Sequence, residues 1–547
     1  MLKRIIILAA LVITLVVPFA LRPNQTSREH ADDILTIITP HNEAIRHEFT
    51  LGFRQWYQER TGRTVAIDWR VIGGTSDIAR FLESEYVAAF RNHWTNSLRR
   101  PWSIEVLAGF SNHRLSSDAS AIAKEAREVF LASEVGCGID VFFGGGPYDF
   151  IVQGNAGRIV SNRLLQTHPE YFVDEIIPQT FAGEEFWDKQ GRWIGTVLST
   201  YGIIYNRDAL KRLGIDRAPA DWSDLADGRY IGEIALADPT KSSSITKAFE
   251  NLIQQQMQRR LAQLRRLEAG ENGDDAERKA ALEKQAVRDG WLAGLRVLQL
   301  IGANARYFTD SSQKPPIDVA QGDCAAGICI DFYGRSQVEV TQQRGAGEAR
   351  LAFVSPRGGA VSSVDPVALL RGAPNREVAE AFIEYNLTMD AQKLWNFRPG
   401  TPGGPSRYAL RRLPVRRDFY EHAEWKEFRS DPEEEPFAGS EQLIYQPAWT
   451  GGVFREMAFI IRVMTLDTHQ ELVRAWRAIN AAPEPRKASA LARLQDLSAV
   501  NYERASQEIK RALASKNKVD EITLARTLGD LFRKQYAEAE AIALGAN

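Results

Sequence analysis

The sequence predicts an α/β protein with at least two α/β lobes joined by crossing strands. From residue 34 onward, short apolar segments rich in β-branched residues alternate with longer segments of helical spacing. The chain has 547 residues, far more than one hydrophobic core usually serves. It contains only three cysteines, which is too few for a disulfide framework, so packed cores must hold it together.

The N-terminal segment predicts export from the cytoplasm. Lys3 and Arg4 precede an apolar run from Ile5 to Val17, and a polar stretch follows. A basic start, a short apolar core and a polar exit are typical of a secretory signal. Residues 1–31 are therefore expected to be either a cleaved signal or a retained membrane anchor. Both alternatives place the remainder in the periplasm, tethered to the inner membrane if the segment is retained.

The first elements predict a β-α-β-α order and hence parallel strands with right-handed crossovers. Residues 34–39 and 65–71 are apolar and β-branched, and residues 43–60 between them place aromatic side chains on one helical face. A third strand is expected at 139–143, and a helix at 375–387. Residues 193–205 form one long apolar stretch on both sides of Ser199 and Thr200. Such a strand is expected to cross between two lobes.

These elements suggest a division of the chain. The first lobe would comprise residues 32–200 and 356–410, and the second lobe residues 201–355. Further strands are expected at residues 231–237, 325–332, 351–354 and 367–370. Residues 254–288 are rich in Gln, Arg, Glu, Lys, Ala and Leu, which predicts a charged helical hairpin, either a solvated decoration or a docking surface for a membrane partner. Residues 411–547 are expected to form a helical C-terminal extension.

Polar residues follow many of these strands, where ligands bind in open α/β sheets. The loops after the first three strands and residues 238–244 offer hydroxyls and N–H groups at helix starts, which suit an anion. Each also has a structural alternative, since Asn42, Ser242 and Ser243 can cap helices and the glycines can serve tight turns. The predicted ligand-binding residues are His41, Asn42, Glu43, Gly74, Thr75, Gly145, Thr200, Thr240, Ser242, Ser243, Asp331, Tyr333 and Ser363.

Several classes of function lack their motifs. The net charge of −2 gives no reason to expect a nucleic-acid partner. The chain has no GxSxG elbow, HExxH pair, phosphate-binding P-loop or GxGxxG, so neither an enzyme of those classes nor a dinucleotide cofactor is expected. Cys324 and Cys329 are close enough in sequence to pair, but they also fit small buried side chains.

The ordered segments resemble the family 1 extracellular solute-binding proteins of ABC transporters, in the branch of the ferric-ion and thiamine-type binding proteins. The segments are ILTIITPHNEAIRHEF, GIDVFFGGG, WIGTVLSTYGIIYNRDAL, GEIALADPTKSSSITKAFE, DVAQGDCAAGICIDFYGR and SSVDPVALLRGAPNREVAEAFIEY. The resemblance covers roughly residues 34–410. It implies a type II periplasmic-binding-protein fold, in which two α/β lobes are joined by crossing strands and the ligand lies in the cleft between them.

The resemblance also implies where a metal would bind. Ferric-binding members use a His in the first loop, a Glu after the third strand and two adjacent Tyr at a later strand end. Here His41, Glu43 and Tyr333 fall in such positions, but Gly144, Gly145 and Gly146 replace the carboxylate loop and only one Tyr is present. We therefore expect Fe(III), if it binds, to bind as a chelate and not as a bare ion, because a bare ion needs several anionic oxygen ligands. The glycines would leave space for a bulkier ligand with its own oxygens.

The resulting hypothesis is the substrate-binding component of a bacterial ABC importer, with no enzymatic activity and no resident cofactor. It would act as a monomer that captures an iron chelate, a thiamine-like compound or a phosphate-bearing compound and delivers it to a permease in the inner membrane. The alternative is an extracytoplasmic sensor domain or enzyme built on the same fold.

Overall fold

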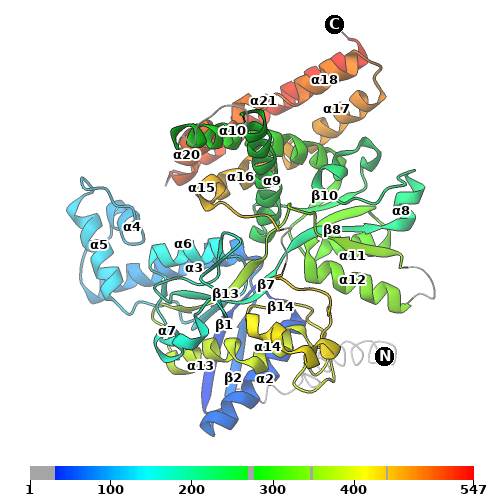
Figure 1. Cartoon of the computed structure of the whole chain (residues 1–547). Coiled ribbons are helices and arrows are strands. Elements are labelled where there is room, and N and C mark those ends of the chain that lie inside the picture. The colour runs from blue at the N-terminus through cyan, green and yellow to red at the C-terminus, as the bar shows by residue number, and fades with distance from the viewer. Residues whose placement is uncertain (1–30, 269–275, 345–348, 439–441, 516, 547) are drawn as a thin grey trace, which may run out of the picture.

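The computed structural model describes residues 31–268, 276–344, 349–438, 442–515 and 517–546. Its strands form two large sheets and one small hairpin, and Figure 1 shows the two sheets in separate halves of the molecule. Almost all of the predicted signal or anchor segment, residues 1–31, lies outside this part of the chain. Among the described residues, no helix is long and apolar enough to cross a membrane.

The first sheet has seven strands in the order β14-β7-β13-β3-β1-β2, with β4 paired beside β13. β1 is parallel to β2 and β3, which confirms the predicted β-α-β start, whereas β13 is antiparallel to β3, β4 and β7. The strands are β1 (Asp33–Ile38), β2 (Val65–Arg70), β3 (Val141–Phe143), β4 (Ile159–Val160), β7 (Trp193–Ser199), β13 (Ser363–Leu370) and β14 (Leu413–Pro414). β5 (Thr180–Phe181) and β6 (Glu184–Glu185) form the separate hairpin.

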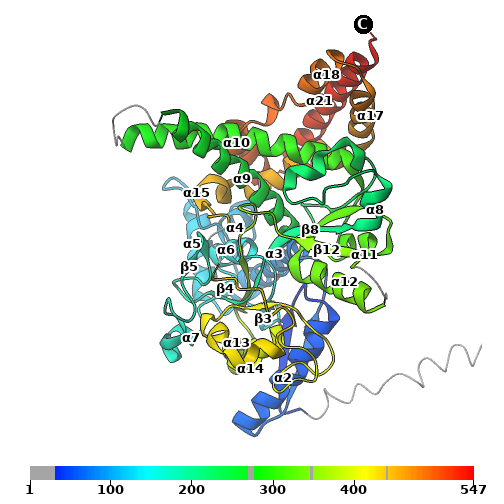
Figure 2. The ribbon, with the colours of Figure 1, turned by 45° about the vertical axis from the view of Figure 1, so that its right-hand side comes forward.

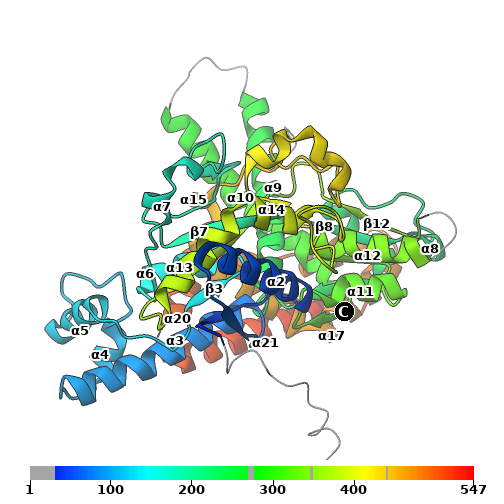
Figure 3. The same ribbon diagram turned by 90° about the horizontal axis from the view of Figure 1, so that it is seen from below.

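Helices pack around this sheet, and Figure 3 shows α4 and α5 beside the outer end of α3. Aromatic side chains fill the core, with Phe49, Phe143 and Trp395 in mutual contact. The helices are α2 (Glu43–Thr61), α3 (Thr75–Asn92), α4 (Ile104–Gly109), α5 (Ala121–Ala132), α6 (Pro147–Ala156), α7 (Leu164–Thr167), α13 (Arg376–Leu387) and α14 (Met389–Asn396). α2 and α13 lie within one residue of their predicted ranges.

The second sheet has five strands in the order β10-β9-β11-β8-β12. Its strands are β8 (Tyr201–Asn206), β9 (Ile234–Ala237), β10 (Ala305–Thr309), β11 (Ala326–Ile330) and β12 (Leu351–Val354). The helices of this half are α8 (Arg207–Arg212), α9 (Ser243–Glu268), α10 (Ala276–Asn304), α11 (Lys314–Gln321) and α12 (Asp331–Arg344). Cys324 and Cys329 are buried free thiols, which fits small core side chains and not a disulfide.

The predicted crossing at residues 193–205 is confirmed, because β7 belongs to the first sheet and β8 to the second. Residues 355–362 return the chain from β12 to β13, and a third passage runs through residues 442–446. In this third passage the Leu443 N–H donates to the Ala360 carbonyl at 3.1 Å, and the Tyr445 N–H donates to the Ala182 carbonyl at 2.8 Å. The two α/β halves joined by crossing strands are the predicted fold class. The exact lobe boundaries remain a prediction.

The helical C-terminal region is confirmed, but it begins at residue 447 and not at residue 411. The earlier residues include β14, which pairs with β7, so they belong to the first sheet. Proline is tolerated in β14 because this strand lies at the sheet edge. The region contains α15 (Pro447–Thr450), α16 (Phe454–Ile461), α17 (His469–Ala481), α18 (Arg486–Leu494), α19 (Tyr502–Arg504), α20 (Lys510–Ala514) and α21 (Lys518–Leu544).

These C-terminal helices pack against the inner part of the hairpin formed by α9 and α10, as Figures 1 and 2 show. Trp291 of α10 is buried and donates its indole N–H to the Val500 carbonyl at 2.9 Å, and Gln299 donates to the Leu494 carbonyl at 2.9 Å. Buried side chains of the hairpin and the C-terminal helices share one hydrophobic cluster with the second sheet. The base of the hairpin is therefore core, which neither the solvated nor the docking alternative anticipated.

Candidate functional site

His41 follows β1 and is buried at the start of the candidate site, with 5% of its surface exposed. Its ring packs edge-on against Phe143 at 4.5 Å and Trp395 at 5.9 Å between centroids. The Nε2 atom lies 3.5 Å from Oδ2 of Asp365. Burial lowers the pKa of His41, and the nearby Asp365 only partly opposes this effect, so the ring is neutral at neutral pH.

The glycine loop after β3 serves a different purpose from the one predicted. Gly144 and Gly145 have φ angles of +89° and +106°, which favour glycine. A Cβ atom on Gly144 would overlap the His41 ring, and one on Gly145 would overlap the Thr75 side chain. The expected space for a bulkier ligand is thus filled, at these two glycines, by the chain's own residues.

Asn42 and Glu43 mainly serve helix α2. The Asn42 side chain accepts a hydrogen bond from the Ile45 N–H at 3.1 Å, which is the helix-capping alternative. Glu43 is exposed in the first turn, whereas His41 is buried, so these two side chains do not share an environment. Among the described residues, no three His, Cys, Asp or Glu side chains are grouped as metal ligands. The ferric-ion set of His41, Glu43 and Tyr333 remains a prediction without support from this geometry.

Two helix starts of the first lobe face the start of α9 in the second. Gly74 is the N-cap of α3, and a Cβ atom there would lie 2.6 Å from the Lys241 carbonyl oxygen. Gly146 is the N-cap of α6, and a Cβ atom there would lie 4.0 Å from the Ser243 hydroxyl. The N-termini of α3, α6 and α9 therefore meet across the boundary between the halves. Since helix N-termini carry unpaired N–H groups and partial positive charge, this arrangement favours an anion.

The three hydroxyls predicted in this second-lobe loop have different environments. Asp238 accepts hydrogen bonds from both the Thr240 N–H at 2.8 Å and the Thr240 hydroxyl at 2.7 Å. Ser242 accepts from the Ile245 N–H at 3.4 Å, as a helix cap does. Ser243 is 5% exposed, and its hydroxyl has no hydrogen-bond partner among the described residues. Of the three, only Ser243 has its hydroxyl beside a side chain of the first half, the carboxyl of Asp149.

Asp149 of α6 lies beside the Ser243 hydroxyl. Burial raises the pKa of Asp149 to about 6, while Ser243 and Arg80 oppose the rise. The Oδ2 atom of Asp149 also lacks a partner within the described part of the chain. The meeting point of α6 and α9 is therefore a buried polar site in which the Ser243 hydroxyl and the Asp149 carboxyl are neighbours across the two halves.

The strand end after β11 joins the same region. The Asp331 N–H donates to the Thr200 carbonyl at 3.0 Å, and the Asp331 carboxylate pairs with Arg335. Tyr333 lies beside Asn42 of the first lobe, and burial raises the pKa of its phenol above the usual value. Ser363, which starts β13, is 2% exposed and its hydroxyl is unpaired within the described residues. Of the predicted residues, Asn42, Gly74, Ser243 and Tyr333 thus lie against the other half, whereas Glu43 is exposed.

Sequence reasoning missed Arg412, the most deeply buried cation of this region. Its side chain is 1% exposed and lies 2.8 Å from Oδ2 of Asp365. It also donates to the Ser199 hydroxyl at 2.5 Å. Arg412 was overlooked because residues after 410 were expected to be helical, and Asp365 because its strand was expected to begin at residue 367. The edge-strand proline Pro414 was the signal that could have corrected the first error.

A second buried cluster, also missed, joins the halves near the third chain passage. The Lys247 Nζ atom lies 2.5 Å from Oε1 of Glu184 and 2.9 Å from Oε2 of Glu250. Its ammonium group also lies 3.4 Å from the centre of the Tyr445 ring. Glu184 belongs to the β5–β6 hairpin and Lys247 to α9, so this ion pair connects one half with the other. Burial tends to lower the pKa of Lys247, but the two carboxylates outweigh it and hold that pKa above its usual value.

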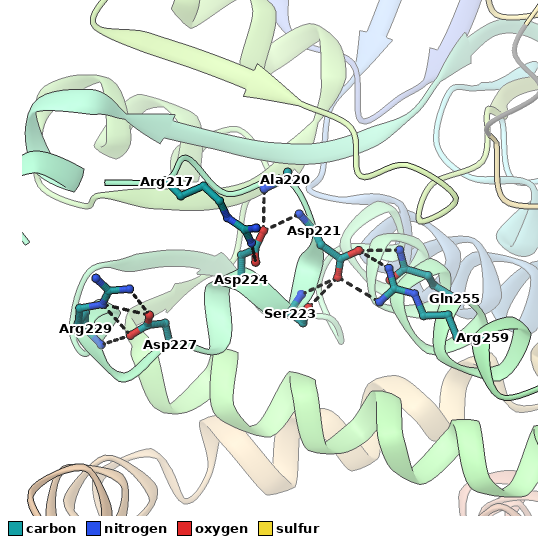
Figure 4. A network of polar contacts seen from close by, with 9 residues as sticks. All are labelled: Arg217, Ala220, Asp221, Ser223, Asp224, Asp227, Arg229, Gln255 and Arg259. Atoms are coloured by element: carbon teal, nitrogen blue, oxygen red, sulfur yellow. Dashed lines mark hydrogen bonds and ion pairs between the residues drawn. The ribbon is translucent and has the colours of Figure 1, made fainter. Parts of the chain in front are cut away.

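A pocket of about 380 Å³ lies elsewhere, near the loop before β9. Figure 4 shows the polar contacts of its charged residues and their neighbours. Its charged residues are already paired: Arg217 with Asp224 at 2.8 Å and Arg229 with Asp227 at 2.6 Å. Gln255 donates to nearby Asp221 at 3.0 Å. Because this surface satisfies its own charges, it offers less to a ligand than the boundary between the halves.

The chain is similar in sequence to proteins that are already known. An uncharacterized protein of Haemophilus influenzae is 24% identical over 256 residues, which are 47% of this chain and 60% of that protein. The phosphoglycerate transport regulatory protein PgtC of Salmonella typhimurium is 24% identical over 201 residues, 37% of this chain and 40% of PgtC. The chain thus spans less than two thirds of the length of these relatives.

Among solved structures, the periplasmic binding protein AfuA of Actinobacillus pleuropneumoniae, with fructose-6-phosphate bound, is 17% identical with a TM-score of 0.47, covering 82% of this chain and 98% of AfuA. The apo ferric ion-binding protein A of Pasteurella haemolytica is 13% identical with a TM-score of 0.48, covering 80% and 99%. Residues 139–414, half of the chain, match the sequence family of bacterial extracellular solute-binding proteins. Together with two α/β halves joined by crossing strands, this match shows that the chain belongs to that family.

Proposed function

We propose that the protein is the solute-binding component of a bacterial ABC importer and captures a small phosphate-bearing solute between its two lobes. The observation that carries this proposal is the meeting of three helix N-termini, those of α3, α6 and α9, across the boundary between the halves. Phosphate groups bind favourably at such helix starts, because backbone N–H groups point toward them. The PgtC relative, named for phosphoglycerate transport, suggests the first compound to test.

The protein would act in the periplasm as a monomer, close over its solute and deliver it to an inner-membrane permease without changing it chemically. Fe(III) would enter as a chelate whose own oxygens face the helix starts. The grouping of first-lobe and second-lobe residues at one boundary favours this function over the alternative of a sensor domain or enzyme, which would need a reactive group or a signalling partner.

Calorimetric titration of the purified protein with 3-phosphoglycerate, fructose-6-phosphate and ferric citrate tests this proposal. Unphosphorylated glycerate and fructose are the matched controls. We expect saturable binding of at least one phosphorylated compound and at least tenfold weaker binding of its unphosphorylated partner. If all five compounds fail to bind, and native mass spectrometry of protein purified from its own host finds no bound phosphate ester or chelate, the proposal is wrong.

The hydroxyl of Ser243 is the residue-level test of the helix-start site. Ser243→Ala should weaken binding of the phosphorylated compound by about 0.5–1.5 kcal/mol, the usual contribution of one hydrogen bond, or more if the acceptor is charged. Ser84→Ala is the matched control, because Ser84 lies on the exposed side of α3 and donates only to the Arg80 carbonyl. Equal affinities for the two variants would remove Ser243 from the site.

A further inference from the structure

Arg412 is held in place as a planar cation at the boundary between the halves. Its backbone N–H donates to the Trp395 carbonyl at 2.8 Å, and its carbonyl accepts from Asn396 at 3.0 Å, which fixes the chain just before β14. Its guanidinium lies 4.3 Å from the centre of the Phe332 ring. Since Phe332 belongs to α12 of the second lobe, Arg412 extends from the first sheet to touch the second lobe. Stacking on an aromatic ring fixes the plane of a guanidinium and directs its N–H edge.

Arg412 pairs with fewer carboxylates than the neighbouring arginines Arg335 and Arg411 do. Arg335 pairs with the carboxylates of Asp331, Asp431 and Glu434, and Arg411 pairs with those of Glu339 and Asp431. Arg412 pairs with Asp365 alone, and Asp365 Oδ2 also lies 3.5 Å from the His41 ring. The Nε atoms of all three arginines are buried without a hydrogen-bond partner in the described part of the chain, so the number of paired carboxylates is what distinguishes Arg412. Because Arg412 has a single carboxylate partner and a buried N–H without an acceptor, it is the arginine of this group with the most capacity for a further anion.

Asp365 can release the guanidinium more readily than an isolated buried carboxylate could. Its side chain is 18% exposed, so water can reach it. Its Oδ1 atom accepts from the Ser199 hydroxyl at 3.3 Å, and its Oδ2 atom faces the His41 ring. Burial tends to raise the pKa of Asp365, but Arg412 and His41 outweigh it and hold that pKa below its usual value, so the carboxylate is ionised. Asp365 is therefore an internal anion that occupies Arg412 and retains partners without it.

We propose that Arg412 receives the phosphoryl group of the solute in exchange for Asp365, which makes this pair the element that selects phosphate esters over carboxylates. A carboxylate ligand would replace the Asp365 carboxylate beside Arg412 with another group of single negative charge. The exchange would therefore add little to the free energy of binding. A phosphate ester carries about −1.5 to −2 charges at neutral pH and three strong acceptor oxygens, enough to engage both the Nε and Nη groups. This inference rests on the proposed function and adds the residue that recognises the ligand.

The inference is tested by calorimetric titration of the full chain. The three ligands are inorganic phosphate, 3-phosphoglycerate and glycerate. Asp365→Asn removes the competing charge while keeping a similar shape, so it should bind inorganic phosphate at least fivefold more tightly than the wild type. This variant should also bind glycerate more tightly than the wild type does. The ratio of its affinities for 3-phosphoglycerate and glycerate should therefore be smaller than that of the wild type. Unchanged or weaker phosphate binding by Asp365→Asn would overturn the inference, including the case in which the wild type binds none of the probes.

Replacing Arg412 requires a control for folding, because Arg412→Gln would leave Asp365 ionised and without its cation. The double variant Arg412→Gln/Asp365→Asn removes both charges together, and circular dichroism should show that it stays folded. We expect it to bind 3-phosphoglycerate at least tenfold more weakly than Asp365→Asn does. Arg412→Lys should rescue only part of that loss, because an ammonium cannot present two parallel N–H groups.

The outcomes separate this inference from the proposed function. A wild type that binds 3-phosphoglycerate, together with a double variant that binds it as tightly, would leave the solute-binding function intact and assign phosphate recognition elsewhere. If neither the wild type nor Asp365→Asn binds any phosphorylated compound, both proposals fail.

Discussion

At the scale of single residues, the site depends on contacts that leave no periodic pattern in the sequence. His41 could be predicted because it follows a recognisable strand, but its burial against Phe143 and Trp395 could not, since Trp395 is 354 positions away. The pairing of Arg412 with Asp365 is similar, because it depends on an edge strand of only two residues. The positions of strand ends therefore predict where a ligand can bind. Which charged side chains pair with one another there depends on tertiary packing, which the sequence pattern does not reveal.

Gly144 offers a test of this local packing. Gly144→Ala must accept both an unfavourable φ of +89° and an overlap with the His41 ring, whereas Gly62→Ala must accept only a φ of +71° with no atom within 4 Å. A strained backbone conformation alone costs about 1–3 kcal/mol. We expect Gly144→Ala to lower the free energy of unfolding by at least about 1 kcal/mol more than Gly62→Ala. Denaturant titration measures both, and equal losses would mean that His41 moves aside freely.

Asp149 should make stability depend on pH. Its folded pKa of about 6 lies above the ordinary 3.8, so the folded state binds a proton that the unfolded state lacks between those values. The stabilising contribution of this proton to the free energy of unfolding is fully present below pH 3.8 and is lost as the pH rises through about 6. At 1.36 kcal/mol per pKa unit it amounts to at most about 3 kcal/mol, and the helix start at α6 reduces it.

Asp149→Asn removes this titration. The melting temperature of Asp149→Asn minus that of the wild type should therefore be larger at pH 7.5 than at pH 4.5. Thermal melts of both proteins at the two pH values measure this difference. Asp77→Asn is the control, because Asp77 also lies in the first turn of a helix but is partly exposed. A wild-type and an Asp149→Asn profile that run parallel across this range would contradict the assignment.

At the scale of elements, helical and strand patterns predicted most of the architecture. β12 matches its predicted range, and α2 and α13 differ from theirs by one residue, because each has a clear apolar periodicity or cap. β13 begins at residue 363, four residues before its predicted start, since Pro366 interrupts the apolar pattern at a bulge. The prediction for the hairpin of α9 and α10 was incomplete for another reason. Its charged residues lie in its outer half, whereas C-terminal helices about 200 residues later in the chain pack against its inner half.

This packing predicts that the C-terminal region is needed for the second lobe to be stable. Phe532 of α21 is fully buried, and Phe532→Ala should lower the free energy of unfolding by about 3–5 kcal/mol, the usual cost of removing a buried aromatic side chain. Leu544→Ala lies on the same helix but is 64% exposed, and should change stability by less than about 0.5 kcal/mol. Chemical denaturation followed by tryptophan fluorescence measures both. A small loss for Phe532→Ala would show that α21 does not stabilise the core.

At the scale of the whole molecule, buried ion pairs help to hold the two halves together. The Glu184–Lys247 pair is the clearest, since its side chains are only 4% and 10% exposed. Glu184→Ala leaves Lys247 with Glu250 alone and removes one ion pair between the halves, while the pairs of Arg335 with Asp431 and Glu434 and of Arg411 with Glu339 remain. The arrangement seen here should then open more readily, because Lys247 no longer has a carboxylate partner in the first half.

Small-angle X-ray scattering should show a larger radius of gyration for Glu184→Ala than for the wild type, with recovery at saturating 3-phosphoglycerate as the lobes close by hinge motion. Glu380→Ala is the control, because Glu380 pairs with Arg163 and Arg376 inside the first lobe. Identical scattering of all three proteins would mean that the Glu184–Lys247 pair does not hold the halves together.

The third chain passage has a mechanical consequence. Two adjacent connections permit both bending and torsion of one body against another, whereas a third connection, tied to Ala360 and Ala182 by backbone hydrogen bonds, opposes torsion. Tyr148 of α6 adds a fourth point of support, since its ring stacks on Phe454 of α16 at 4.4 Å. The relative movement of the two halves is thereby reduced toward a single degree of freedom. A donor–acceptor dye pair with one dye on α5 and the other on α21 would therefore report that one coordinate directly.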